Sequence, residues 1–367
     1  MSTSTPSPRN PGPSWGYGFL LWAERWWPRW LFRPVLLAGT GVALAGMPVQ
    51  RAHSRAYLAV VLGRPATLTE VWRHFFALAE SLVFSLRAAR GVPVRCVLEP
   101  EHEAAFETLV RSGRPALFGT FHFGGSDLLG YLLSERGRRV TILRLQVGNS
   151  TDTRLLGERF GRQVSFLWIN DPARLLFDLK AALEAGESLA LKCDRLEYSA
   201  RSEAFRFLGA TRLFPFTIYH LALLFDRPVV FCTAVPDSAR DQLRVHASPV
   251  FTPDPAADRA TNNRAARRHF QAVLDQLEIL VRAHPFLWFN FIPLNPEAAS
   301  AASETNPWIL RCAQDDNQMP GADYGVSSNQ PISTSGHSER SEESRPAQAT
   351  SLSLREIPHC VRNDKRA

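Results

Sequence analysis

Residues 117–133 read LFGTFHFGGSDLLGYLL, and this stretch decides the fold. Its apolar beginning, which extends back to residue 116, is short and is followed by a turn signal, as expected of a buried strand. From residue 128 the chain is apolar again and is predicted to start a helix. Between the two, His122 stands at the carboxyl end of the strand, and Gly124 and Gly125 allow the backbone to turn sharply. The stretch therefore predicts a strand, a turn and a helix.

From residue 100 onward, apolar runs alternate with helix-like segments. Besides residues 116–121, the runs predicted to be buried strands are 140–145, 164–169, 188–191 and 229–235. Residues 171–183 and 214–225 have the length and pattern of helices. Strands joined through helices of this length favour right-handed crossovers. We therefore expect an α/β fold with a mixed, largely parallel central sheet flanked by helices, and active residues where strands end.

The turn after the first predicted strand carries candidate catalytic residues. Ser126 is the expected N-cap of the following helix, and Asp127 falls in its first turn, where the helix dipole favours a carboxylate. This places Asp127 near the imidazole of His122. An acid beside a histidine fixes its tautomer and stabilises the imidazolium that forms when it accepts a proton. We predict His122 as general base, Asp127 as its orienting partner, and the N–H groups of Gly124 and Gly125 as donors to a developing oxyanion.

The spacing of His122 and Asp127 alone is a weak signal, since a histidine and an aspartate at this distance are more often structural. Their position across a glycine turn, between a buried strand and an apolar helix, is what favours catalysis. No G-x-S-x-G nucleophile elbow is present, and Ser126 lies too near the helix start for a nucleophile. A reaction in which the acceptor itself attacks the donor is therefore simpler than one through a covalent enzyme intermediate.

Composition argues against several classes of protein. The chain has 42 lysines and arginines against 35 aspartates and glutamates, a net charge of +7, yet no basic run is typical of a nucleic-acid-binding arm. The five cysteines include no C-x-x-C pair, and the histidines and cysteines lack the spacing of a metal site. No glycine-rich nucleotide-binding fingerprint occurs. We expect reduced cysteines, no metal, no cofactor and no nucleic acid as partner.

The first 50 residues differ in character from the rest. Residues 1–14 are rich in serine and proline and are predicted to be a disordered leader. Residues 15–50 mix tryptophans with arginines, which suits a membrane interface, but their uncharged run, 35–49, is shorter than the roughly 20 residues of a spanning helix. We predict a membrane-associating helical segment; the alternative is a set of core helices in a soluble protein. By the positive-inside rule, the body is then expected on the cytoplasmic face of the cell inner membrane.

Several blocks, in order between residues 15 and 293, resemble those of the lysophospholipid acyltransferase superfamily, in particular its lipid A late acyltransferase branch. Besides residues 122–127, these blocks are WRHFFALAES at 72–81, Asp194-Arg195, FLG at 207–209, Phe214-Pro215, LA at 221–222, RPVV at 227–230 and HPFLWFNF at 284–291. The chain departs from the family pattern at Gly125-Ser126 and at Phe216-Thr217.

The resemblance implies an acyltransferase-like fold, with residues 51–295 as the acyltransferase domain. It implies transfer of a fatty acyl group from an acyl carrier protein or coenzyme A thioester to a hydroxyl of a lipid A-type glycolipid. The acceptor hydroxyl, deprotonated by His122, would attack the thioester directly. A lysophospholipid, an aminolipid or an aryl polyene as acceptor would use the same residues. A catalytically silent membrane protein that binds lipid is the alternative of a different class.

Two further sets of residues are candidates for substrate binding. Asp194 and Arg195 follow a predicted strand, and an arginine there suits a phosphate because it contacts phosphate through two donors. The alternative is an ordinary surface ion pair. Phe207, Phe214 and Phe216 are predicted to line an acyl groove, although aromatic residues in such positions are more often part of the core.

The end of the chain is predicted to be a disordered tail. Residues 304–367 are rich in serine, asparagine and proline and show no helical or strand period. The segment ILRCAQDDN at 309–317 is echoed by IPHCVRNDK at 357–365, a pattern typical of a translated genomic repeat. We expect the tail to contribute nothing to the core or to activity.

Overall fold

The computed structural model of this protein describes residues 18–19, 22–23, 25–89, 91–130, 133, 136–144, 163–169, 172–196, 201–237 and 240–298. All of them belong to one unit of the chain, Met1–Gln318. The predicted leader, residues 1–14, and the predicted tail, residues 304–367, lie outside the described residues. The same holds for residues 15–17 of the predicted membrane-associating segment.

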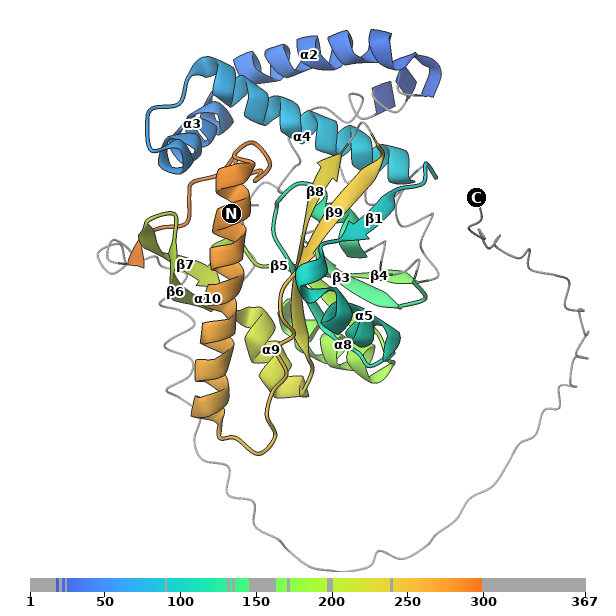
Figure 1. The fold of residues 1–367 in the computed structure, drawn as a ribbon, viewed down its shortest axis with the longest axis vertical. Coiled ribbons are helices and arrows are strands. Elements are labelled where there is room, and N and C mark those ends of the chain that lie inside the picture. The colour runs from blue at the N-terminus through green and yellow to red at the C-terminus, as the bar shows by residue number, and fades with distance from the viewer. Residues whose placement is uncertain are drawn as a thin grey trace, which may run out of the picture. The chain divides into compact units, whose positions relative to one another are not determined.

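The described strands form a seven-stranded sheet and a separate two-stranded hairpin (Figure 1). The strands are β1 (Arg95–Leu98), β2 (Leu117–Thr120), β3 (Val140–Arg144), β4 (Val164–Trp168), β5 (Ser188–Lys192), β6 (Ser202–Phe207), β7 (Ala210–Pro215), β8 (Val229–Asp237) and β9 (Gln242–Ala247). The large sheet has the order β1-β9-β8-β2-β5-β3-β4. Every neighbouring pair in it is parallel except β8 and β9. The predicted α/β fold with a largely parallel sheet is therefore confirmed.

Strand β2 lies at the centre of the sheet, between β8 and β5, and all four of its residues are buried. Successive side chains of a strand point to opposite faces. Leu117 accordingly packs in the core on one face and Phe118 in the core on the other. The five predicted strands correspond to β2, β3, β4, β5 and β8. Their mainly apolar runs identified them, and the runs of β2 and β8 are also buried over most of their length, as expected of central strands covered on both faces.

Helices cover both faces of the sheet. The elements are η1 (Pro100–His102), α5 (Glu103–Arg111), η2 (Ser126–Leu128), α8 (Pro172–Glu184), α9 (Thr217–Phe225) and α10 (Arg259–Ala283). Side chains of α8, α9 and α10 join the core that contains Leu117. Side chains of α5 and η2 join the core that contains Phe118. The predicted helix at 171–183 thus corresponds to α8.

The helix predicted at 214–225 begins later than expected, because its first residues belong to strand β7. This strand pairs with β6 in an antiparallel hairpin. Leu208 and Gly209, between the two strands, both have positive φ, 51° and 77°. Two such residues form the tight turn that matches the twist of a hairpin. A leucine in this conformation is uncommon, so the sequence carried little sign of the turn.

Among the described elements, the helices α2 (Arg29–Gly46), α3 (Pro48–Leu62) and α4 (Leu68–Ala89) precede the sheet. Both α2 and α3 pack against α4. Among the described residues, no single helix is both long enough and apolar enough to cross a membrane. The segments Leu31–Gly46 and Pro48–Leu62 meet that test only together, and they are bent by 98° at the break between them.

The turn after β2 requires glycine at position 124. Gly124 has φ +53°, and a Cβ atom added there would lie 2.1 Å from the carbonyl oxygen of Ala234. Gly209 also has a positive φ, +77°, but an added Cβ would meet nothing within 4 Å. The first position therefore combines conformational strain with a backbone clash, whereas the second has the strain alone.

Gly124→Ala should lower the free energy of unfolding by about 3 kcal/mol or more, and the matched Gly209→Ala by only about 1 kcal/mol. Urea unfolding followed by circular dichroism measures both losses. Equal losses at the two positions would show that the close approach of Gly124 to Ala234 does not constrain the turn.

Candidate active site

His122 and Asp194 form the centre of the site. They follow β2 and β5, which are parallel neighbours in a register that pairs Thr120 with Lys192, so each stands two residues beyond that pair. Nδ1 of His122 lies 2.7 Å from Oδ1 of Asp194. The backbone N–H of His122 donates to Oδ2 of the same carboxylate at 2.8 Å. The parallel register thus brings together two residues that are 72 positions apart in the chain.

Asp194 is 2% exposed, and donors surround its carboxylate. In addition to His122, the indole Nε1–H of Trp288 donates to Oδ2 at 2.8 Å. The side-chain amide of Asn295 holds the backbone carbonyl of Asp194 at 3.0 Å. Burial alone raises the pKa of Asp194, but His122, Arg195 and the hydrogen bonds outweigh it, so the pKa lies below its usual range. The group is therefore a carboxylate at neutral pH.

The Asp194 carboxylate determines the tautomer of His122. Because a carboxylate can only accept, Nδ1 carries the proton and Nε2 the lone pair. Burial lowers the pKa of His122; Asp194 opposes this shift, while the positive charges of Lys192 and Arg195 add to it. The net result is a pKa below the ordinary value of 6.5. His122 is thus a neutral imidazole at pH 7, the form that accepts a proton.

Asp127 is not the carboxylate that holds Nδ1 of His122, and the prediction of its role is corrected here. It lies in the first turn of η2, as expected, and its Oδ1 is 2.7 Å from Nζ of Lys192. Partial burial raises the pKa of Asp127, but Lys192 and Arg144 outweigh it and hold the pKa below its usual range. When His122 is protonated, its charge also acts on Asp127, so the two residues share one electrostatic environment. The neighbouring strand supplies the orienting carboxylate because it ends level with His122.

The predicted oxyanion donors are already engaged. The N–H of Gly124 donates to the carbonyl of Leu287 at 2.7 Å, and the N–H of Gly125 donates to that of Ala234 at 2.9 Å. The glycines serve instead to let the turn approach its neighbours closely. A developing negative charge must therefore be stabilised by groups other than these two amides.

Ser126 also differs from its predicted role. Its Oγ donates back to the carbonyl of Phe123 at 2.6 Å, its residue is 4% exposed, and Gly125 rather than Ser126 occupies the N-cap position of η2. The hydroxyl is thus buried and hydrogen-bonded away from His122. This geometry offers no serine nucleophile.

Positive charge gathers at the carboxyl edge of β3 and β5. Lys192 and Arg144 both act on Asp127, and Arg195 acts on His122 and on Asp194. Arg195 also donates to the carbonyl of Phe289 at 3.3 Å. The predicted acceptor-binding pair is therefore divided: Asp194 orients His122, while Arg195 contributes charge beside it. Among the residues that the structure describes, no cluster of three or more histidine, cysteine or acidic side chains is arranged to hold a metal.

The predicted acyl-groove residues lie in the core. Phe207, Phe214 and Phe216 are all 1% exposed or less. Phe207 packs edge-to-face on Trp288, and Phe214 and Phe216 surround Phe270. None of the three has an open face on which an acyl chain would lie. Their function in this structure is to support Trp288 and the adjacent helix α10.

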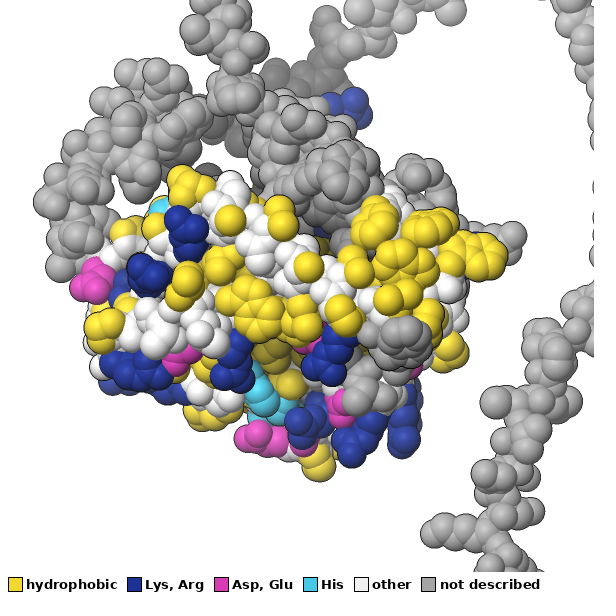
Figure 2. Space-filling view, turned by 90° about the horizontal axis from the view of Figure 1, so that it is seen from above, with side chains coloured by type: hydrophobic (Ala, Val, Ile, Leu, Met, Phe, Trp, Pro, Cys, Tyr) yellow, Lys and Arg dark blue, Asp and Glu magenta, His cyan; other side chains and the backbone are white. Residues whose placement is uncertain are grey.

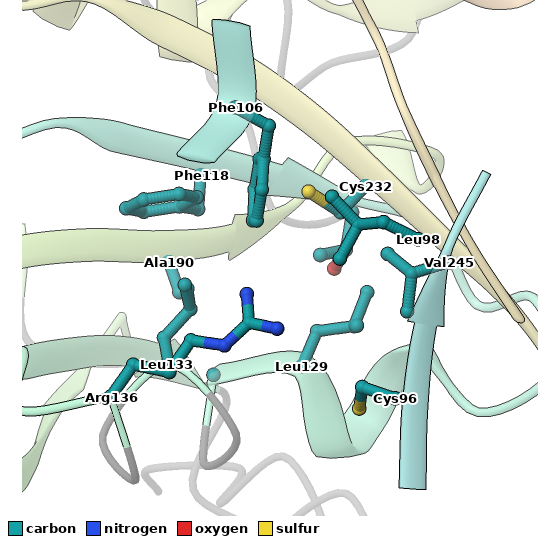
Figure 3. A pocket seen from close by; sticks show the side chains of 12 residues that line it. Cys96, Leu98, Phe106, Phe118, Leu129, Leu133, Arg136, Ala190, Cys232 and Val245 are labelled. Atoms are coloured by element: carbon teal, nitrogen blue, oxygen red, sulfur yellow. The ribbon is translucent and has the colours of Figure 1, made fainter. Parts of the chain in front are cut away.

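Two pockets lie near these elements. One, of about 490 Å³, is lined by Arg73, Phe76, Ala77 and Glu80 of α4 together with residues 283–287. The other holds about 30 Å³ and lies in the core that contains Phe118 (Figure 3). The second has the room of about one water molecule, far less than an acyl chain needs. The larger pocket includes Leu287, whose carbonyl accepts from the N–H of Gly124, and the smaller one includes Thr120, two residues before His122.

Comparison with models of known protein families and with curated protein sequences finds no match to this chain. The arrangement of side chains at His122 is therefore the basis for an interpretation of function.

The pKa of His122 should respond in opposite directions to its two charged neighbours. Asp194→Asn removes the negative charge that stabilises the imidazolium, so the pKa should fall further below 6.5. Lys192→Met removes a repelling positive charge, so the pKa should rise. Both pKa values are measured by NMR titration of the imidazole. The His122 signal is identified as the one that is missing from the spectrum of His122→Ala. A wild-type pKa at or above 6.5, or a rise in Asp194→Asn, would contradict this electrostatic account.

Proposed function

We propose that this protein is an acyltransferase that moves a fatty acyl group from an acyl carrier protein or coenzyme A thioester to a hydroxyl of a membrane lipid, with a lipid A-type glycolipid as the first candidate. The observation that carries the proposal is the contact between Nδ1 of His122 and the buried carboxylate of Asp194, at the carboxyl edge of a parallel sheet. This is the arrangement of a general base rather than of a surface ion pair.

In the proposed reaction, Nε2 of His122 takes the proton of the acceptor hydroxyl while the hydroxyl oxygen attacks the carbonyl carbon of the thioester. The tetrahedral intermediate then expels the donor sulfur, which takes the same proton from the imidazolium and leaves as a free thiol. Asp194 stabilises the imidazolium between the two steps. The buried Ser126 supports direct transfer, because its hydroxyl donates to Phe123 and not to His122.

The cations at the site support an anionic reaction partner. Since the amides of Gly124 and Gly125 are engaged, the charges of Lys192, Arg195 and Arg144 are the groups proposed to favour the oxyanion. The same charges favour substrates that carry phosphate, whether on the acceptor or on the phosphopantetheine arm of the donor. A phosphorylated acceptor is therefore preferred over a neutral one in this proposal.

The N-terminal helices support an acceptor at a membrane surface. Trp22 and Trp26 are 51% and 66% exposed, and Val42 and Val49 of the bent pair are 74% and 60% exposed. Arg25 lies over the ring of Trp26, so the charge and the aromatic face form one amphipathic unit. Seen from above, Figure 2 shows a broad yellow area of hydrophobic side chains with dark blue arginines and lysines beside it. We propose that this surface binds the cytoplasmic face of the cell inner membrane.

The proposal is tested by His122→Ala. Loss of the proton acceptor should reduce the rate of acyl transfer by about 10²- to 10⁴-fold without loss of the fold. Ser126→Ala is the matched control from the same turn, and it should keep most of the activity. The assay measures transfer of a labelled acyl group from acyl carrier protein or coenzyme A into membrane lipid. A folded His122→Ala variant that is fully active would refute the mechanism, and a folded but inactive Ser126→Ala variant would restore the covalent route.

A further inference from the structure

The segment 284–291 lies directly against the turn that carries His122. The N–H of Gly124 donates to the carbonyl of Leu287 at 2.7 Å, and the N–H of Phe289 donates to the carbonyl of His122 at 2.8 Å. Trp288, between these two contacts, donates its indole N–H to Asp194. The position of this segment therefore determines both the backbone of the turn and one hydrogen bond to the carboxylate of Asp194.

His74 of α4 holds the same segment from the opposite side. Its residue is fully buried, and its Nε2 lies 2.9 Å from the carbonyl oxygen of Trp288. Its Nδ1 lies 2.8 Å from Oγ of Ser54 on α3. Because a carbonyl can only accept, Nε2 is the donor, and Nδ1 of the neutral ring accepts from the Ser54 hydroxyl. Burial lowers the pKa of His74 to about 4, which keeps the ring neutral at physiological pH.

Packing leaves His74 little freedom to reorient. Its ring stacks on Phe291 with centroids 4.3 Å apart and lies 5.3 Å from the ring of Tyr57. The hydroxyl of Tyr57 in turn donates to the carbonyl of Pro285 at 2.8 Å. Helices α3 and α4 therefore bind the segment at two carbonyl groups, those of Pro285 and Trp288. The carbonyl of Trp288 also accepts from the N–H of Asn290, so His74 reinforces a tight turn from outside.

We propose that His74 is a positioning residue for His122: by binding the carbonyl of Trp288, it keeps the indole N–H of Trp288 on the carboxylate of Asp194. The chain of contacts runs from α3 and α4 through Trp288 and Asp194 to the imidazole. In the proposed function, α3 also carries Val49, one of the exposed residues of the membrane-binding surface. The fixed geometry of the base thus depends on a helical pair remote from it in the chain.

A histidine buried among aromatic residues also has a plain packing role, and the two roles differ in their effect on His122. Among the described residues, the charges that act on His122 include those of Asp194, Lys192 and Arg195, and Asp127 pairs with Lys192. If Trp288 no longer donates to Asp194, the carboxylate keeps more of its negative charge toward the imidazole. The imidazolium is then better stabilised, so the pKa of His122 rises. A loss of packing alone leaves that pKa unchanged.

Two substitutions of similar polarity separate these roles. In His74→Gln, the amide N–H reaches the position of Nε2 and can still donate to the carbonyl of Trp288. In His74→Asn, the amide reaches only the position of Nδ1, so the contact with Ser54 remains and the contact with Trp288 is lost. Trp288→Phe removes the indole N–H directly. Ser54→Ala removes a buried hydrogen bond of the same helices without changing any group that contacts Trp288.

NMR titration of the His122 imidazole is the test. The pKa should rise by roughly 0.5 to 1 unit in His74→Asn and in Trp288→Phe, with no further rise when both are combined. It should keep the wild-type value in His74→Gln and in Ser54→Ala. An unchanged pKa in His74→Asn beside a raised one in Trp288→Phe would overturn the proposal, as would a rise in His74→Gln equal to that in His74→Asn. If His74→Asn does not fold, a wild-type pKa in Trp288→Phe would also overturn it.

The role of His74 as a positioning residue rests on the proposed function, but the pKa of His122 can be measured whatever the function is. The pKa of His122 is read without substrate, so it tests the contact chain even if the reaction is of another kind. An active His122→Ala variant would overturn the acyltransferase proposal and leave the His74 result standing.

Discussion

The hydrogen bond between His122 and Asp194 is the interaction on which the rest of the site depends. A carboxylate that is 2% exposed is stable only where donors replace the lost water. The backbone N–H of His122, its Nδ1–H and the indole N–H of Trp288 supply that replacement. Each donor needs its own support, and these supports are the β2–β5 register, the glycine turn and the segment 284–291. The elements around His122 thus together stabilise the buried carboxylate of Asp194.

The charges around the pair divide into two functions. Asp194 orients the imidazole, whereas burial, together with the positive charges of Lys192 and Arg195, keeps the pKa of His122 below its ordinary value, and these cations favour negative charge nearby. Asp127 is 44% exposed and pairs with Lys192, so it partly neutralises the positive charge at the carboxyl edge of β3 and β5. In the proposed reaction, His122 is neutral before it accepts the proton and is stabilised by Asp194 afterwards. The same field suits a phosphorylated reaction partner, in keeping with the proposed acyl transfer.

Sequence patterns predicted the parts of this structure that depend on local composition. The strands containing Leu117 and Val229 are mainly apolar and largely buried, and the position of His122 at the end of the first follows from that run. The partner of His122 could not be predicted in the same way, because Asp194 meets it through strand order and register rather than through spacing. Asp127 is the first acidic residue after His122, so local spacing favours it as the partner of the imidazole. Hydrogen bonds that occupy Gly124 and Gly125 likewise come from residues far along the chain.

The central claim is that Asp194 acts on the reaction through His122, and a double-mutant cycle on acyl transfer tests it most directly. The rates of Asp194→Asn, His122→Ala and the double variant are compared with wild type under one set of conditions. If Asp194 acts only by orienting and stabilising the imidazole, Asp194→Asn has a large effect in the wild-type background and little or none once His122 is alanine. A loss of the same factor in both backgrounds would show that Asp194 acts independently of His122, which contradicts the account.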